Sequence, residues 1–149
     1  MPSYPDLSVA LRDAIINGTG VTDQLGQNSG GDNVFTSRPI PSTAPYPMIV
    51  IGPDIGPNDQ GGLNDERLVI MRHVGVYGQN TGTDKTQYRA VETTAQLIRD
   101  LFHRKPTAIK VTGWNVVQIW TRGPLVGPTS DDKFVSRIVE LTITLIAPM

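Results

Sequence analysis

The longest helical pattern in the chain lies between residues 84 and 105. Apolar residues recur there at intervals of three and four, and polar residues fill the opposite face. The apolar stripe consists of Tyr88, Val91, Ala95, Ile98 and Phe102, with Leu97 and Leu101 at its margin. Asp84 suits the N-cap, Gln87 is placed to complete a capping box, and Pro106 ends the pattern. The spacing predicts an amphipathic helix about 30 Å long, enough to lie across a small sheet.

A second, shorter helix is predicted at the start of the chain. Residues 7–15 carry the same apolar spacing, at Leu7, Ala10, Leu11, Ala14 and Ile15. Pro5 and Asp6 suit its first turn, and Asn17-Gly18 closes it. Residues 21–25 are expected to add one further turn.

The remaining apolar segments have the alternation of β-strands. Residues 34–35 start an extended piece, followed by strands at 48–51, 67–77, 114–121 and 133–146 and a brief one at 108–111. In the strand at 67–77, Leu68, Ile70, Val74 and Val76 share one face, which Arg72 interrupts. In 114–121 we expect Trp114, Val116 and Trp120 on one face. In the last strand Val139, Leu141, Ile143 and Leu145 alternate with Glu140, Thr142 and Thr144, which predicts one solvated face.

Long Gly/Pro-rich connections are predicted at residues 52–65 and 122–132. The whole chain, residues 1–149, is expected to form one domain of the α+β class. Its predicted architecture is a single antiparallel or mixed β-sheet with one long and one short helix packed on one face.

Composition and charge narrow the class of protein. The chain has no Cys, so disulfides and thiolate metal sites are excluded. It has no apolar run of about 20 residues and no signal-peptide core, which predicts a soluble protein assembled in the cytoplasm. Residues 1–66 hold two basic and eight acidic residues, a net charge of −6. Residues 67–149 hold eleven basic and six acidic residues, a net charge of +5. Ordinary surface variation is the simpler explanation of this asymmetry; the alternative is a dipolar subunit suited to head-to-tail contact.

Catalytic and cofactor patterns are not found. His73 and His103 are the only histidines and are expected to be structural, His103 as a cation at a helix C-terminus. No spacing suits a metal site, and the Gly clusters lack the order of a phosphate-binding loop. Asp131-Asp132 fits a hairpin turn better than a carboxylate pair. We therefore predict no catalytic residue, no metal and no cofactor.

One basic cluster stands out, formed by Arg99, His103, Arg104, Lys105 and Lys110. A dedicated DNA-binding domain normally carries more positive charge than a chain with a pI near 6.1. Passage of DNA without specific binding is compatible with these charges.

The order of segments resembles the tail-terminator, or tail-completion, proteins of long-tailed bacteriophages. The resemblance is carried by LSVALRDAI, by VFTSRPIPSTAPYPMIVIG, and by HVGVYGQNTGTDKTQYRAVETTAQLIRDLF, followed by two β segments. It covers most of the chain. The segment GPDIGPNDQGGLND is longer and richer in Gly than the family leads one to expect, which leaves the interface loops unassigned.

The resemblance implies a structural virion protein of the tail or neck. Such a protein forms a hexameric ring that caps the tail tube, stops its polymerisation and joins the tail to the head. Its partners would be copies of itself, the tail tube protein, a head-side neck or connector protein, and a sheath if the tail is contractile. Genome DNA would pass through the ring without specific binding, and no membrane would be involved.

Loop length and charge identify candidate interface residues. These are Asp54, Asn58, Asp59, Gln60, Arg104, Lys105, Lys110, Arg122, Asp131, Asp132 and Lys133. Segments 52–65 and 122–133 are expected to contact tube or neck, and the 99–110 cluster an acidic neighbour. Alternatives stay open: another head-closure or neck adaptor, a small cytoplasmic α+β enzyme or ligand-binding domain, and a free-standing nucleic-acid binder.

Overall fold

A computed structural model describes residues 5–26, 33–36, 40, 45–59, 67–79, 86–127 and 134–148. In chain order the elements are α1 (Leu7–Asn17), β1 (Val34–Phe35), β2 (Met48–Asp59), β3 (Arg67–Gln79), α2 (Thr86–Phe102), the 3₁₀ turn η1 (Pro106–Ala108), β4 (Asn115–Val126) and β5 (Phe134–Ile146). The strands form one sheet in the order β1-β2-β3-β5-β4. Only β1 and β2 are parallel, so the sheet is mixed.

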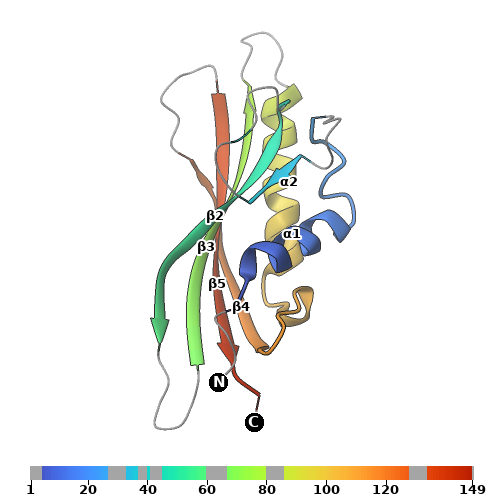
Figure 1. Cartoon of the computed structure of the whole chain (residues 1–149). Coiled ribbons are helices and arrows are strands. Elements are labelled where there is room, and N and C mark those ends of the chain that lie inside the picture. Colours follow the sequence, from blue (N-terminus) through green and yellow to red (C-terminus); the bar gives the residue numbers. More distant parts are fainter. Residues whose placement is uncertain are drawn as a thin grey trace.

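Both helices cover the same face of this sheet, as Figure 1 shows. The predicted α+β class, with a long and a short helix on one face of a mixed sheet, is therefore confirmed. The other face, called the outer face below, has no helix on it in the described part of the chain. Among the described residues, no helix is long and apolar enough to span a membrane.

The core lies between the helices and the sheet. The predicted stripes are buried, and their fully buried members include Leu11, Ile15, Val91, Ala95, Ile98 and Phe102 on the helices and Ile70, Val74, Val139, Leu141 and Ile143 on the sheet. Tyr88 is the exception in the stripe of α2, because 39% of it is exposed. Its hydroxyl accepts a hydrogen bond from Arg137 of β5, at 2.8 Å.

The start of α2 is fixed against the end of β3. A Cβ on Gly78 would lie 2.6 Å from Cγ2 of Val91, so this close approach of helix to strand requires glycine. The backbone N–H of Gln79 donates to Oε1 of Gln87 at 2.6 Å. Gln87 therefore joins helix to strand, whereas Asp84, the other member of the predicted capping box, lies outside the described residues. At α1, Asp6 serves as the N-cap, since Val9 N donates to Asp6 Oδ1 at 3.4 Å.

Residues 18–25 form consecutive turns and not the extra helical turn that the sequence suggests. Similarly, residues 108–111 do not form a strand. Ala108 ends η1, and Val111 makes only an isolated bridge to Trp114.

β2 is longer than the sequence predicts. The expected end at Gly52-Pro53 is wrong, because the strand continues to Asp59 along β3. Two register shifts, between Ile51 and Asp54 and between Ile55 and Asn58, interrupt the pairing at the glycines and prolines. β1 pairs only with Ile49 and Val50, so the rest of β2 is an edge, where a residue without an N–H is tolerated.

β4 likewise extends past its predicted end at Thr121, to Val126, with a register shift between Arg122 and Leu125. An earlier shift lies between Val116 and Gln118. Beyond it the alternation is displaced by one residue. Val116 pairs with Leu145 on the helix-covered face, whereas Trp120 pairs with Thr142 on the outer face. The expectation that Val116 and Trp120 share a face is therefore wrong.

Arg72 does lie on the helix-covered face of β3, as predicted, and is only 3% exposed. Its Nε donates to the carbonyl of Gly52 at 2.6 Å, and its Nη2 donates to Oγ of Ser8 at 2.8 Å. A buried charge is tolerated where hydrogen bonds replace its hydration. Arg72 thus ties β3 to both β2 and α1.

The central place of α2 can be tested with Ile98→Ala. The side chain is fully buried, so its loss should reduce the free energy of unfolding by about 2–5 kcal/mol. Thr93→Ala, at an exposed position of the same helix, is the control and should change it by less than about 0.5 kcal/mol. Urea unfolding followed by circular dichroism gives both values. Equal effects would contradict this assignment of the core.

Candidate protein-interaction surface

The two connections predicted to contact partners lie at opposite ends of the sheet. Residues 60–66 join β2 to β3 at the end where Arg67 pairs with Ile146, and residues 128–133 join β4 to β5 where Gln79 pairs with Phe134 (Figure 1). Gln60, Asp131, Asp132 and Lys133 lie outside the described residues. The strand ends that these two connections join are therefore at opposite ends of the β3–β5 ladder.

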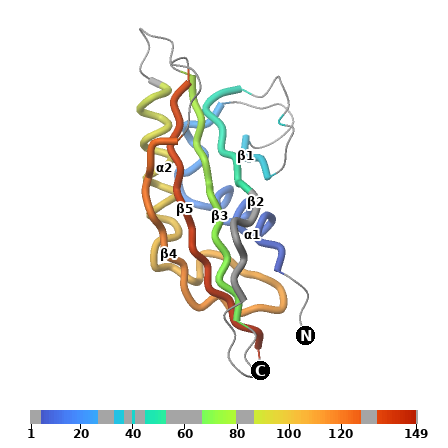
Figure 2. The backbone as a smooth tube through the Cα atoms, turned by 90° about the vertical axis from the view of Figure 1, so that its left-hand side faces the viewer, coloured from blue at the N-terminus to red at the C-terminus, as the bar shows by residue number. Residues whose placement is uncertain are grey.

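The remaining candidates divide between the two lateral sides of the molecule. Asp54, Asn58 and Asp59 belong to β2, of which the structure describes only the backbone there. Arg122 is exposed on β4, on the far side of β3 and β5. Figure 2 shows α2 and β4 along one side of the molecule, and β1 and β2 along the other. Arg104 and Lys105 follow α2 directly and belong to the β4 side.

The segment after α2 covers part of the free edge of β4. The backbone N–H of Arg104 donates to the carbonyl of Ile119 at 2.9 Å. Two residues further along β4, Thr121 N lies 3.3 Å and Thr121 Oγ1 lies 2.8 Å from Nδ1 of His103. Exposed strand edges recruit other strands, so these bonds block strand addition at this point.

His103 is held as a neutral acceptor in this arrangement. The backbone N–H of Thr121 can only donate, so Nδ1 of His103 accepts this hydrogen bond through its lone pair. In a neutral imidazole the proton is then on Nε2. Loss of solvent contact lowers the pKa of His103, nearby Arg99 and Arg104 lower it further, and Asp100 acts in the opposite direction. The expectation that His103 serves as a helix-end cation is therefore wrong. Its ring bonds the helix end to the sheet.

Next to His103, Arg104 and Trp120 form a stacked pair, which we call the Arg104–Trp120 platform. Cζ of Arg104 lies 5.0 Å from the centre of the Trp120 ring. The His103 ring lies 4.8 Å from that ring, tilted by 55°. Of the Trp120 residue, 43% is exposed, although a tryptophan in a β-pattern is ordinarily assigned to the core. Sequence reasoning missed its role because the register shift that turns it outward leaves no signal in the residue types.

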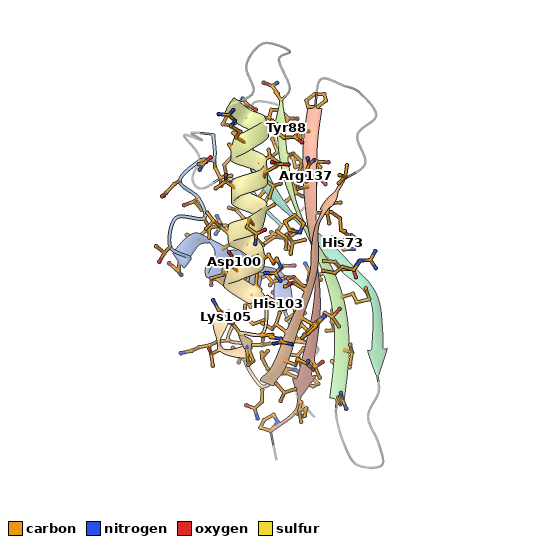
Figure 3. All side chains as sticks on the ribbon, turned by 180° about the vertical axis from the view of Figure 1, so that it is seen from behind. His73, Tyr88, Asp100, His103, Lys105 and Arg137 are labelled. Atoms are coloured by element: carbon orange, nitrogen blue, oxygen red, sulfur yellow. The ribbon has the colours of Figure 1, made fainter. Side chains whose placement is uncertain are left out.

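Asp100 is close enough to His103 to act on its pKa, and it has partners of its own. Nη1 of Arg99 lies 3.4 Å from its Oδ1, Gln96 donates to the same oxygen at 3.1 Å, and Nζ of Lys105 donates to its backbone carbonyl at 2.8 Å. Figure 3 shows Asp100, His103 and Lys105 together at the C-terminal end of α2. Lys110 lies apart, lining a groove of about 420 Å³ between α1 and residues 107–110. The predicted basic cluster is thus brought together except for Lys110.

The outer face of the sheet carries a polar row. His73, Glu140 and Arg122 are register neighbours across β3, β5 and β4, and Nε2 of His73 lies 3.2 Å from Oε2 of Glu140. Apolar residues on the same face are partly exposed, among them Trp120, Phe134 and Ile146. The prediction that one face of β5 is exposed to solvent is only partly correct, because Thr144 on that face is buried.

A second arginine cluster lies near the other end of α2. Nη2 of Arg137 donates to the hydroxyl of Tyr88 at 2.8 Å and to Oε1 of Glu92 at 3.0 Å, and the guanidinium stacks on the Tyr88 ring at 5.1 Å (Figure 3). These contacts fasten α2 to β5. Sequence reasoning did not identify it, since nothing in the strand pattern links Arg137 to a helix 45 residues earlier.

A metal site is not evident in the part of the chain that the structure describes, where no three His, Asp or Glu side chains gather. The two grooves described in this region are open surface features lined by few charged groups; the second, of about 480 Å³, lies between α2 and Pro124. This geometry offers contact surfaces and not an enclosed pocket with convergent polar groups.

Comparison with known proteins identifies a similar fold. No family model matches the chain, and no match to a curated protein was found. Among solved structures, the chain is similar to a protein in a structure described as the virion of a native gene transfer agent particle. The TM-score is 0.72 over 95% of both chains, at 13% sequence identity. Since so low an identity does not carry function, this likeness establishes a shared fold over nearly the whole chain.

The neutral state of His103 leads to a pH-dependence prediction. A His pKa that is lower in the folded than in the unfolded chain contributes stability that is complete above about pH 6.5 and falls as the pH drops below it. Asn at this position offers an acceptor near Thr121 without titrating. Between about pH 7.5 and pH 5, His103→Asn should therefore lose less of its free energy of unfolding than the wild type. Urea unfolding at both pH values measures this. A larger loss in the variant would refute the neutral-acceptor role.

Proposed function

We propose that this chain is a structural virion protein of a tailed phage or phage-like particle. The observation that carries the proposal is the full-length similarity to a chain of the gene transfer agent virion, since 95% of each chain is matched. The resemblance of the segment order to tail terminators supports it independently. The charged side chains that the structure describes either bond elements of the fold to one another or face solvent. This suits a protein that acts by assembly and not by catalysis.

Within that class, we assign the chain to the tail terminator. It forms a ring, proposed to be hexameric, that caps the tail tube, stops its polymerisation and joins tail to head. A closed ring needs two different lateral surfaces on each subunit. It also needs two axial ends, one toward the tube and one toward the neck. The sheet supports both requirements. Its two lateral sides differ, and the β2–β3 and β4–β5 connections leave from opposite ends of the β3–β5 ladder. A neck or head-closure adaptor uses the same architecture and is the second candidate.

The ring is tested with purified protein and tail tubes of the same particle. Light scattering should detect a hexamer, either free or only after tubes are added, and electron microscopy should find it at one end of each tube. Binding to portal-side components instead would favour the neck adaptor. A protein that remains monomeric and binds neither partner would contradict the proposal.

The opposite positions of the two connections give a sharper test. In one variant residues 60–66 are replaced by a Gly/Ser linker of equal length, and in the other residues 128–133 are replaced in the same way. Flexible linkers preserve chain closure, so both variants should fold. One variant should fail to cap tubes and the other should cap tubes but fail to join heads. If both variants fail at the same step, the two ends do not serve different partners.

A further inference from the structure

The Arg104–Trp120 platform holds a guanidinium at the surface that has no carboxylate partner among the described residues. Arg104 is exposed, and its Cζ lies 5.0 Å from the centre of the Trp120 ring. A guanidinium that stacks through its flat face keeps the N–H groups at its edge free to donate hydrogen bonds. Two parallel N–H donors match the two oxygens of a carboxylate. Stacking therefore positions this group for a carboxylate without using its donors.

A second guanidinium lies beside the platform. Trp120 precedes Arg122 by two residues on β4 with no register shift between them, so both side chains are on the outer face, about 7 Å apart along the strand. Arg122 is exposed and has no ion pair in the part of the chain that the structure describes. Glu140, its register neighbour on β5, is instead 3.2 Å from Nε2 of His73. The surface around Trp120 thus carries two arginines without a carboxylate in the described structure.

The Trp120 ring itself offers an apolar contact. Of this residue 43% is exposed, although the His103 and Arg104 side chains lie against the ring. Tryptophan and arginine are the residues that most often dominate binding energy at protein interfaces. The adjacent backbone edge is blocked, because the N–H of Arg104 bonds to Ile119 and the N–H of Thr121 bonds to His103. A partner is therefore contacted here through side chains and not by addition of a strand.

The remaining charges at this end of α2 favour separate carboxylates over a polyanion. Nη1 of Arg99 lies 3.4 Å from Oδ1 of Asp100, and Nζ of Lys105 donates to the Asp100 carbonyl at 2.8 Å. These two cations have partners within the chain, and 56% of the Asp100 side chain is exposed as a negative charge. Nucleic acid is bound by a longer basic track with many phosphate contacts. Two guanidinium groups beside an exposed indole suit a few carboxylates next to an apolar group.

We propose that the Arg104–Trp120 platform, together with Arg122, is a docking site for an acidic segment of another protein. Carboxylates of aspartate or glutamate in that segment accept hydrogen bonds from the two guanidinium groups, and an apolar side chain of the segment covers the Trp120 ring. The site needs a partner of this chemistry and no particular ring symmetry. It goes beyond the proposed function and does not depend on it.

A labelled peptide tests the site on the full-length protein. The probe is a fluorescein-labelled peptide in which glutamates surround one phenylalanine, and its control has glutamine in place of every glutamate. Fluorescence anisotropy should show that the wild type binds the glutamate peptide about tenfold or more tightly than the glutamine peptide. Binding of the glutamate peptide should weaken between about 0.05 M and 0.5 M salt, because the contacts are between charges at the surface.

The decisive variant is Arg104→Gly. Residue 104 has φ +60°, which glycine adopts without strain, and the backbone N–H that bonds to Ile119 is retained. The melting temperature should therefore change little, whereas the affinity for the glutamate peptide should fall about tenfold or more. Arg122→Gln should also weaken binding. Arg89→Ala removes an exposed charge elsewhere on α2 and should bind like the wild type.

Two further variants separate the paired donors of the guanidinium from charge and from folding. Arg104→Asn also tolerates the left-handed backbone and should bind as weakly as Arg104→Gly. Arg104→Lys keeps the charge without the two parallel donors and should lose less affinity than either.

Three outcomes would overturn the proposal. The first is that the wild type binds the glutamate and glutamine peptides equally, and the second is that Arg104→Gly binds the glutamate peptide as tightly as the wild type. The third is that the wild type prefers a fluorescein-labelled oligothymidylate of equal charge and Arg104→Gly loses that binding, which would make the occupant nucleic acid. None of these results decides the proposed function, because capping of tail tubes is measured separately.

Discussion

The pairing of β3 with β5 is the constraint on which the rest of the structure depends. All residues from Arg67 to Gln79 pair with residues from Ile146 to Phe134, without a register shift. A side-chain period of two then fixes which residues of both strands face the helices. Val74 pairs with Val139 and Ile70 with Ile143, so α2 packs on a continuous apolar surface. The same ladder separates the β2–β3 and β4–β5 connections by the whole length of the strands.

Irregularity is confined to the strands on either side of this ladder. β2 and β4 each carry two register shifts; β4 is the edge strand of the sheet, and β2 is an edge except where β1 pairs with Ile49 and Val50. A bulge in a central strand would displace residues against two neighbours, whereas at an edge it displaces them against one. The shift after Val116 has the clearest effect, because it turns Trp120 away from the core and toward Arg104. The surface chemistry of this side therefore follows from a backbone irregularity.

This distribution explains how far the sequence could predict the structure. Both helices and the central strands were predictable because their apolar residues repeat with one period, as in Val91, Ala95 and Ile98 of α2. The ends of β2 and β4 were not, since Gly52-Pro53 and Gly123-Pro124 indicate turns locally but are accommodated at edges. Of the candidate interface residues, Arg104 and Lys105 could be grouped by proximity in sequence. Trp120 could not, because its outward position depends on tertiary pairing.

The low sequence identity to the virion protein with the same fold has a physical consequence for the interface. Apolar alternation and helical spacing specify this fold, and many sequences satisfy both. Exposed charges such as Arg104, Lys105 and Arg122 are not required by the core, so a shared fold does not imply shared contact chemistry. At residue 104 the helix end favours glycine and the sequence has arginine, whose guanidinium stacks on the exposed Trp120 ring at the β4 edge.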